Sequence, residues 1–362
     1  MLIKVRPVCG VMPTSERSGS LSFKVNRRTA LGLGAAAAAG AALGSAPATP
    51  GLASAAAPEP ASLTPAQAAT RIRNIYERES ADAGGTWHCF ASVAGADGGR
   101  VQAIADEPDL SVEAFSVNKI AVALAVLDKV DRNLLTLDQR VDVTAAIVIP
   151  AVEGIFALDG AYPSSVTLGH VIAALLTVSD DTAVRLCGLV CPALELNAIL
   201  VAKGFPNTQV VPVANPNRFF LGQTTPRETH DLLRQLAAGT LLSPGSTAYL
   251  LNVLRSLTSF TDGIRRTMSS DERLRIATKA GWFADGRNEA GIIFDTAGAP
   301  ALIYAMFANG QADPDNFGAT HPAVNARARM GRKFLDTVDK LPASAMARAS
   351  FPAPAYTPSN GG

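Results

Sequence analysis

The sequence has little of what metal-binding, nucleic-acid-binding or membrane-spanning proteins require. Its 362 residues include four cysteines and four histidines, which are scattered without the spacing of a zinc site. Charged residues make up only 17%, and the formal net charge of +1 indicates no basic surface for a phosphate backbone. Beyond the N-terminal segment no apolar run is long enough to span a bilayer. We therefore expect no cofactor, no metal, no nucleic-acid partner and no stable membrane insertion of the mature chain.

The few cysteines also argue against a disulfide framework. Cys9 lies in the N-terminal segment, which leaves Cys89, Cys187 and Cys191, an odd number. Cys187 and Cys191 are four residues apart in an expected helix, where the geometry rarely allows a disulfide. We predict that all three are core residues, and the sequence leaves open whether Cys89 pairs with either of the others.

The N-terminus differs from the rest of the chain in charge and composition. Residues 1–55 carry six basic residues and one acid, which leaves 26 basic and 30 acidic residues after them. Asn26-Arg27-Arg28-Thr29 precedes a weakly hydrophobic Ala/Gly-rich stretch, and Ala53-Ser54-Ala55 is a plausible cleavage site. This pattern is typical of a twin-arginine export signal, with a single membrane anchor as the alternative. We expect residues 1–57 to be signal and linker, and the mature protein to be secreted or extracytoplasmic.

Hydrophobic residues make up 48% of the chain, enough for a compact core, and their periodicity predicts helices and strands in a definite order. Strands at both ends enclose a long helical block, which predicts an α+β fold: one antiparallel sheet assembled from both chain ends, with flanking helices and an inserted all-helical region. We expect one domain over 58–342, with a sheet part, a helical part over 116–244, and a flexible tail over 343–362. The expected helices are 64–80, 118–130, 168–187 with a break at 179–181, 226–238 and 323–338; the expected strands are 87–93, 100–105, 275–278, 290–295 and 301–308; the sheet part comprises 62–115 and 245–342.

The first candidate for chemistry is Ser116, three residues before Lys119 at the start of an apolar helix. Residues at i and i+3 share one face of a helix, and the N-terminal end of a helix stabilises developing negative charge. A serine hydroxyl is a poor nucleophile until its proton is removed, and a buried lysine can accept that proton if burial lowers its pKa. Taken alone, a Ser-x-x-Lys tetrapeptide is more often part of a solvent-exposed surface than of an active site.

Two further polar clusters follow in the chain. Ser179-Asp180-Asp181 interrupts a helical stretch, where its plain structural meaning is a helix cap. Lys279-Ala280-Gly281 ends a strand and precedes Trp282. A lysine at a strand edge can attract a substrate carboxylate while the edge pairs with an extended substrate.

Together the three clusters resemble the class A β-lactamases and the related penicillin-binding serine peptidases, which carry Ser-x-x-Lys, Ser-Asp-Asn and Lys-Thr-Gly in this order. The resemblance covers about residues 65–340. It implies a class A β-lactamase-like fold and an acyl-enzyme formed on a small-molecule or cell-wall-peptide substrate. The implied roles are Ser116 as nucleophile, Lys119 as general base, Ser179 as proton relay, Lys279 as carboxylate-binding cation, the backbone N–H groups of Ser116 and Trp282 as oxyanion hole, and Arg287 as a second anion anchor.

Three departures from the family pattern bear on activity. Asp181 replaces an asparagine; an ionised carboxylate cannot donate a hydrogen bond and can pair with Lys119, keeping that lysine charged. Ala280 replaces a threonine and has no hydroxyl for a carboxylate. Between Gly204 and Thr225 there is no Asp or Glu to activate a deacylating water, and Glu228 should point elsewhere from the next helix.

We therefore expect a serine hydrolase that acylates Ser116 with a lactam, ester or amide and hydrolyses β-lactams weakly or atypically. Two alternatives remain open. One is a D-alanyl-D-alanine peptidase, a type of enzyme that also has no glutamate to activate a deacylating water. The other is a non-catalytic β-lactam or peptidoglycan-binding protein, which the changes at Asp181 and Ala280 favour and the intact Ser116, Lys119, Ser179 and Lys279 oppose.

Overall fold

The computed structural model describes residues 62–150, 154–158, 160–342 and 350–360. The chain divides into two units, Met1–Ala57 and Pro58–Gly362. The expected export signal and linker coincide with the first unit, which lies outside the described residues, as does Cys9.

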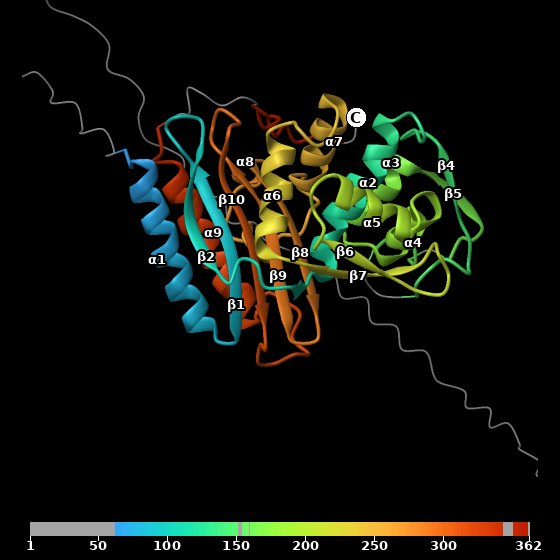
Figure 1. Ribbon diagram of the computed structural model, residues 1–362, viewed down its shortest axis with the longest axis horizontal. Helices are drawn as coiled ribbons and strands as arrows, with labels where there is room; N and C mark the ends of the chain where they lie inside the picture. The colour runs from blue at the N-terminus through green and yellow to red at the C-terminus, as the bar shows by residue number, and fades with distance from the viewer. Residues whose placement is uncertain (1–61, 151–153, 159, 343–349, 361–362) are drawn as a thin grey trace, which may run out of the picture. The chain divides into compact units, whose positions relative to one another are not determined.

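The described chain contains every element expected from the sequence, with ends shifted by up to five residues. The expected break near residue 180 is present: α3 ends at Thr177 and α4 begins at Asp181. The helices Ala193–Ala202, Pro244–Leu254 and Ser270–Arg273 were not expected, and neither were the five short strands between residues 112 and 224. In chain order the elements are α1 (Pro65–Ala83), β1 (Thr86–Ala94), β2 (Arg100–Asp106), β3 (Val112–Glu113), the 3₁₀ helix η1 (Phe115–Asn118), α2 (Lys119–Asp131), β4 (Arg140–Val143), β5 (Ser164–Thr167), α3 (Leu168–Thr177), α4 (Asp181–Val190), α5 (Ala193–Ala202), β6 (Gln209–Pro212), β7 (Phe219–Thr224), α6 (Pro226–Ala237), α7 (Pro244–Leu254), α8 (Ser270–Arg273), β8 (Ile276–Phe283), β9 (Gly286–Phe294), β10 (Pro300–Asn309) and α9 (Pro322–Val338) (Figure 1).

The main sheet has five antiparallel strands in the order β2-β1-β10-β9-β8. Strand β1 from the beginning of the domain pairs with β10 from its end, with Cys89 opposite Met306. The prediction of an antiparallel sheet built from both chain ends is thus confirmed. Strand β8, which carries Lys279, is an edge strand, so one side of its backbone is not paired with another strand of this sheet.

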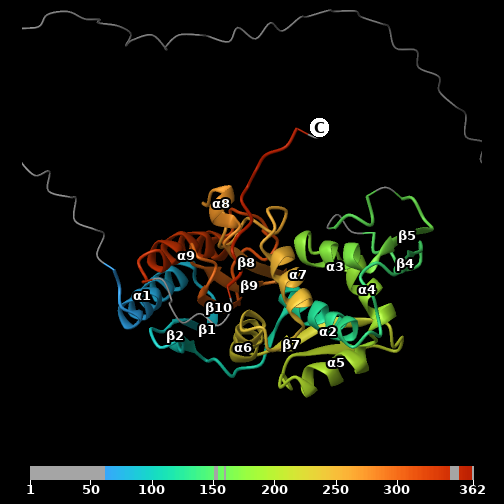
Figure 2. The ribbon, with the colours of Figure 1, turned by 90° about the horizontal axis from the view of Figure 1, so that it is seen from above.

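Alternation along the strands divides the hydrophobic interior into two layers. In β10, Leu302, Tyr304 and Met306 belong to the core shared with α1 and α9, whereas Ile303 and Phe307 belong to the core shared with α2. Successive strand residues point to opposite faces, so one apolar strand serves both cores. Figure 2 shows α1 and α9 on one side of the sheet and α6, α7 and the helical part on the other.

Helix α2 is the centre of the helical part. All residues from Lys119 to Leu127 are buried, because α3, α4, α5 and α7 pack around it. One boundary expected from the sequence is wrong: helix α6 was assigned to the helical part 116–244, yet it packs against β1, β9 and β10. Its apolar stripe, including Leu232, Leu233 and Leu236, explains this position, because that stripe is buried.

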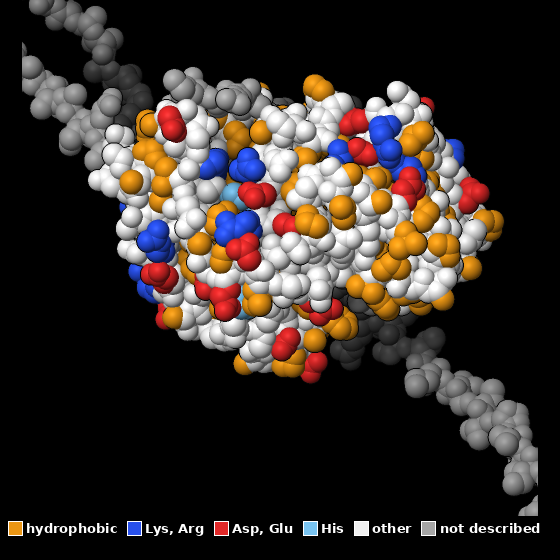
Figure 3. All heavy atoms as spheres, viewed as in Figure 1, with side chains coloured by type: hydrophobic (Ala, Val, Ile, Leu, Met, Phe, Trp, Pro, Cys, Tyr) orange, Lys and Arg blue, Asp and Glu red, His pale blue; other side chains and the backbone are white. Residues whose placement is uncertain are grey.

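The surface of the helical part carries several exposed apolar side chains. Figure 3 shows hydrophobic side chains gathered where Figure 1 places α4, α5, β6 and β7. Among the described residues no single helix could cross a membrane by length and composition; only α4 and α5 taken together, bent by 81°, pass such a test. The exposed apolar residues in these elements include Leu189, Leu194, Val201, Val211 and Phe220.

Both ends of the domain are held by specific contacts. Thr64 caps α1 in a reciprocal capping box with Gln67. The tail was expected to be loose, but this is wrong for Phe351: its ring packs edge-on against Phe294 and its N–H donates to Gly298 O at 2.8 Å. Arg255 donates to the carbonyl of Phe351 at 2.6 Å.

Candidate active site

The site is organised around the hydroxyl of Ser179. Its Oγ lies 3.0 Å from Lys119 Nζ and 3.0 Å from Lys279 Nζ. The two lysines come from α2 and from edge strand β8, 60 and 100 residues away from Ser179 in the sequence. The structure therefore brings the three separate polar clusters of the sequence to one place.

Ser116 lies one turn before Lys119, in η1, and is half-buried. The preceding residue, Phe115, has φ +49°, a left-handed conformation that a non-glycine residue adopts only when its surroundings hold it there. Those surroundings include Gly286, where a Cβ would lie 2.2 Å from the Phe115 ring. Strand β8 also passes close to the serine, since a Cβ on Gly281 would lie 2.7 Å from Ser116 N. The serine thus lies where a strand edge meets a helix start.

Lys119 is fully buried and forms an ion pair. Its Nζ lies 2.6 Å from Asp181 Oδ1 and 2.6 Å from the carbonyl oxygen of Ser179. The side chain of Asp181 is 44% exposed and that of Lys119 is fully buried, so water reaches the carboxylate but not the ammonium. The pairing anticipated from the Asp181 substitution is present. An adjacent carboxylate and a backbone carbonyl both favour the ammonium form of the lysine.

The loop that carries Ser179 is fixed by its neighbour Asp180. This carboxylate caps α4 by accepting from Ala183 N at 3.1 Å, which confirms the capping role read from the sequence. Its other oxygen accepts from Ile155 N at 2.6 Å and Phe156 N at 3.0 Å. Asp180 therefore ties the segment around residue 155 to the start of α4, beside the reactive groups.

Asn118, a residue that the sequence analysis did not single out, positions the neighbouring β7. Its side-chain Nδ2 donates to Leu221 O at 2.7 Å and Gln223 O at 3.1 Å. The amide links η1 to β7, part of a segment that reads as irregular in the sequence because of its prolines and asparagines. Its place inside the Ser-x-x-Lys tetrapeptide was the available signal.

The segment expected to hold a deacylating glutamate in the family is a pair of strands, β6 and β7, and contains no acid. Glu228 follows it on α6, as expected. Its carboxylate accepts from the backbone N–H and side chain of Asn207 and from the hydroxyl of Thr208, all at 2.8–3.0 Å. Glu228 therefore holds the turn before β6.

Strand β8 continues from Lys279 into apolar residues. Ala280 is fully buried, and Trp282 is half-buried and packs on Phe260 with ring centroids 5.0 Å apart. Phe283 is 68% exposed and lies 6.0 Å, centroid to centroid, from Phe115. Phe260 was not identified from the sequence, because it lies on the chain between α7 and α8, 22 residues before its partner.

Arg287 does not have the position expected of an anion anchor. Its guanidinium is fully buried, and its N–H groups make five hydrogen bonds, all to backbone carbonyls. It also lies 4.6 Å over the ring of Phe317. Five donors are all that an arginine has, so the side chain braces the loop around residue 315 and keeps no donor for a substrate. The acceptors are the carbonyls of Ala284, Gly286, Pro314 and Asn316.

The three described cysteines are buried and free, as core residues should be. Burial raises the thiol pKa of Cys89 and Cys187 well above the usual range, and it raises that of Cys191 to about 12. None is a thiolate at neutral pH, so none of the three is a candidate nucleophile. Among the described residues there is no group of three or more His, Cys, Asp or Glu that could hold a metal ion.

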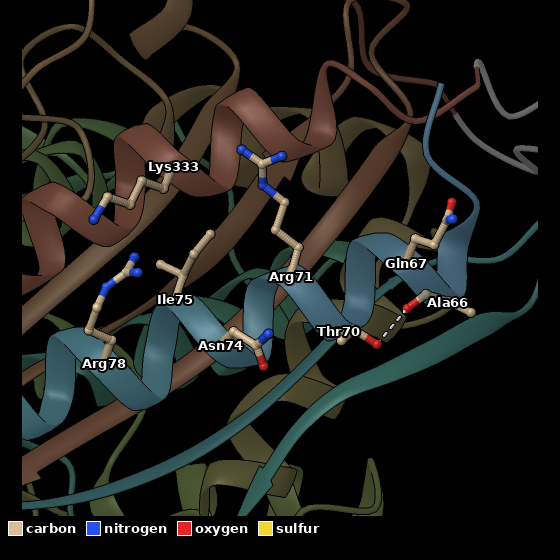
Figure 4. Close-up of a pocket in the computed structure, with 8 residues that line it drawn as sticks. All are labelled: Ala66, Gln67, Thr70, Arg71, Asn74, Ile75, Arg78 and Lys333. Carbon is tan, nitrogen blue, oxygen red and sulfur yellow. Dashed lines mark hydrogen bonds between the residues drawn. The ribbon is translucent and has the colours of Figure 1, made fainter. Parts of the chain in front are cut away.

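A cavity of about 660 Å³ lies elsewhere, between α1 and α9. Figure 4 shows Arg71, Arg78 and Lys333 around it, with Arg71 extending towards α9. Much of this charge is already neutralised, because Lys333 pairs with the buried Glu79, which also lies 3.6 Å from Arg78 Nε. None of the candidate catalytic residues lines this cavity.

Comparison with known proteins places these observations in context. A family described as the β-lactamase enzyme family matches residues 51–338. No curated protein matches the chain. Three solved structures are similar: a β-lactamase from Sphaerobacter thermophilus DSM 20745 (21% identity, 75% of this chain and 98% of that chain, TM-score 0.61), one from Xanthomonas campestris pv. campestris str. ATCC 33913 (22%, 75% and 98%, 0.62), and a mutant of PBP-A in an acyl-enzyme complex with penicillin G (20%, 78% and 100%, 0.59). At these identities the likeness to solved structures shows the class A β-lactamase-like fold.

Proposed function

The chain belongs to the β-lactamase enzyme family, and from that premise we propose that it is an exported serine hydrolase that forms an acyl-enzyme at Ser116. The observation that carries this proposal is the position of Ser179 Oγ, 3.0 Å from the ammonium groups of both Lys119 and Lys279. Both lysines are buried, and their ammonium groups converge on one hydroxyl. Acyl transfer does need such a set of groups, because protons must move between nucleophile and leaving group.

In the proposed acylation, Lys119 in its neutral form takes the proton of Ser116 as Oγ attacks the substrate carbonyl. Ser179 then passes a proton from Lys119 to the leaving group, for which its Oγ is within hydrogen-bonding distance of Nζ. Lys279 orients Ser179 and adds positive charge beside the relay. Since Asp181 favours the ammonium form of Lys119, the reactive neutral form is a minor species at neutral pH.

The oxyanion formed in this step would be held by the backbone N–H groups of Ser116 and Trp282. The close approach of Gly281 to Ser116 N supports this assignment, because it sets the strand next to the serine backbone. Two converging backbone donors are a common way to stabilise such a charge, and the loss of one donor typically costs about 100- to 1,000-fold in rate.

Deacylation is proposed to be slow for β-lactams. Residues 204–225 contain no carboxylate, and Glu228 is engaged with Asn207 and Thr208. Without a positioned base, water attacks an acyl-enzyme about 100- to 10,000-fold more slowly. The similar PBP-A mutant, described as an acyl-enzyme complex with penicillin G, is consistent with a long-lived adduct on this fold.

Export through the twin-arginine pathway is part of the proposal. Its support is the Arg27-Arg28 pair before an Ala/Gly-rich stretch. Folded export suits a protein whose sheet joins strands from both ends of the domain, since the sheet is complete only when the whole domain has been made. Arg27→Lys together with Arg28→Lys should retain the precursor inside the cell, as followed by fractionation and N-terminal sequencing.

A second candidate function is non-covalent binding of a β-lactam or peptidoglycan fragment. The Lys119–Asp181 ion pair favours it, because a lysine in its charged form cannot act as a base. The experiment that decides is intact-protein mass spectrometry after incubation with a fluorophosphonate and with penicillin G. We expect a covalent mass increase that Ser116→Ala abolishes and the control Ser80→Ala, in α1, preserves. Binding without any mass increase would support the second candidate.

A further inference from the structure

The site has lost the groups that would recognise a substrate carboxylate. Ala280, at the position where the family motif has a threonine, lacks a hydroxyl and is fully buried, so no substituent of a substrate can reach its side chain. All five donors of Arg287 are bound to backbone carbonyls. Lys279 is 1% exposed and donates to Ser179 Oγ and to Ala280 O at 2.6 Å.

Aromatic side chains lie on the part of β8 that passes Ser116. Side chains alternate along β8, so Trp282 lies on one side of the strand and Phe283 on the other. Trp282 packs on Phe260, and Phe283 lies beside Phe115, the residue next to the nucleophile. The two pairs therefore border both sides of the strand edge that passes Ser116.

The open edge of β8 can pair with the backbone-like atoms of an extended substrate. A substituent next to the scissile carbonyl would then contact the Trp282 ring on one side of the strand or the Phe283 ring on the other, rather than a cation. Both rings retain exposed surface, with Phe283 68% exposed, and an apolar group that covers them removes that surface from water. A carboxylate placed there would lose hydration without gaining a donor.

The leaving group follows from the charge of the site. Lys119 is held as an ammonium by Asp181, so the base is weak, and an alcohol leaves from a tetrahedral intermediate more easily than an amine does. Resting on the proposed acyl-enzyme at Ser116, we propose that the substrate is an uncharged ester with an aromatic or alkyl group beside the scissile bond. Ser116 Oγ bonds to the acyl carbon as the ester C–O bond breaks, the serine proton leaves with the alcohol, and water then releases the carboxylic acid.

The test compares two esters that differ only in one carboxylate, phenyl phenylacetate and 3-carboxyphenyl phenylacetate. We expect kcat/KM at least about tenfold higher for the neutral ester, because the charged one meets no donor. Trp282→Ala should raise KM for the neutral ester about tenfold and reduce the preference for that ester over the carboxylated one, since the ring that the apolar group would cover is removed. Tyr356→Ala, which removes an exposed aromatic ring of the tail, is the matched control and should change neither.

Failure of this inference is distinguishable from failure of the proposed function, because fluorophosphonate labelling of Ser116 is measured on the same samples. If Ser116 is labelled but the carboxylated ester is hydrolysed as fast or faster, the substrate assignment is overturned and the acyl-enzyme proposal stands. If neither ester is hydrolysed and Ser116 is not labelled, both are overturned. If Trp282→Ala keeps the full preference for the neutral ester, the Trp282 ring is not the cause of that preference.

Discussion

The ammonium of Lys119 and the carboxylate of Asp181 form a 2.6 Å ion pair in which the cation is fully buried and the anion is partly open to water. Pairing compensates the lysine for its loss of hydration, and it does so in the charged form. A general base must lose that proton before it can act. The same pair that stabilises the buried lysine therefore reduces its reactivity near neutral pH.

The first prediction concerns Asp181→Asn. An asparagine can still accept from Lys119 through its side-chain oxygen, but it carries no charge, so the neutral amine becomes more populated at a given pH. The rise of the Ser116 acylation rate with pH should move to lower pH by about one unit, which corresponds to about tenfold faster acylation on the acidic side. Labelling rates with a fluorophosphonate between pH 5 and 10 would measure this.

Asp142→Asn, an exposed position on β4, is the control for a change of one surface charge and should leave the profile in place. A profile of Asp181→Asn that coincides with the unmodified protein, or moves to higher pH, would show that the ion pair does not limit the base.

Each of the three motifs could be located from the sequence because each is a short pattern within one part of the chain. Ser116 and Lys119 are one turn apart, and Ser179 lies at a break between two helices, so each motif is positioned by its own element. Lys279 was expected at the end of a strand, whereas β8 continues past it to Phe283. The pairing of Asp181 with Lys119 followed from the loss of an amide donor, without knowledge of the fold.

Long-range relationships were beyond the sequence. Arg287 lies near the start of β9, and the loop around residue 315, which is distant in sequence, brings carbonyls to three of its five donors. The Trp282–Phe260 contact joins segments with no common pattern. Helix α5 was missed because its apolar residues are spread around the helix, including the 72% exposed Leu194, so it has no clear amphipathic period.

The second prediction concerns Gly281→Ala. The new Cβ would lie 2.7 Å from Ser116 N and 2.8 Å from Val117 N, both backbone atoms that cannot rotate away. Strand and η1 must separate, which disturbs the proposed oxyanion donors, so Ser116 acylation should fall about 100-fold or more. Gly245→Ala in α7, where only Ser243 Oγ lies within 4.0 Å of the added Cβ, should retain full activity. Circular dichroism of both variants checks that the loss is local.

The third prediction concerns pH and His230. Burial lowers the pKa of this imidazole below its usual 6.5. Asp231 raises the pKa, but less than burial lowers it, and the positive charges of Arg100 and Arg234 lower it further. Below pH 6.5 the unfolded chain therefore takes up a proton that the folded chain resists, so stability falls as the pH decreases. Its Nε2 lies 2.7 Å from Ser92 Oγ, which links α6 to β1.

His230→Gln should reduce the loss of stability between pH 7 and 5, measured as urea midpoints at each pH. Part of the loss should remain, because burial also lowers the pKa of His321. The exposed His170→Gln should show the same pH dependence as the unmodified protein. A slope that is identical in all three proteins would exclude His230 as a source of acid sensitivity.

The last prediction concerns the tail that the sequence suggested to be loose. The Phe351 ring packs edge-on against Phe294, and its backbone bonds to Gly298 O and to the buried Arg255. Phe351→Ala removes the ring from the edge of the core beneath the sheet and should lower the free energy of unfolding by about 1–2 kcal/mol, below the 3–5 kcal/mol typical of a fully buried phenylalanine. For a domain of this size each kcal/mol lowers Tm by about 2–4 °C. Tyr356→Ala, 49% exposed on the same tail, should leave Tm unchanged. Equal Tm values for Phe351→Ala and the unmodified protein would mean that this ring adds no stability to the domain.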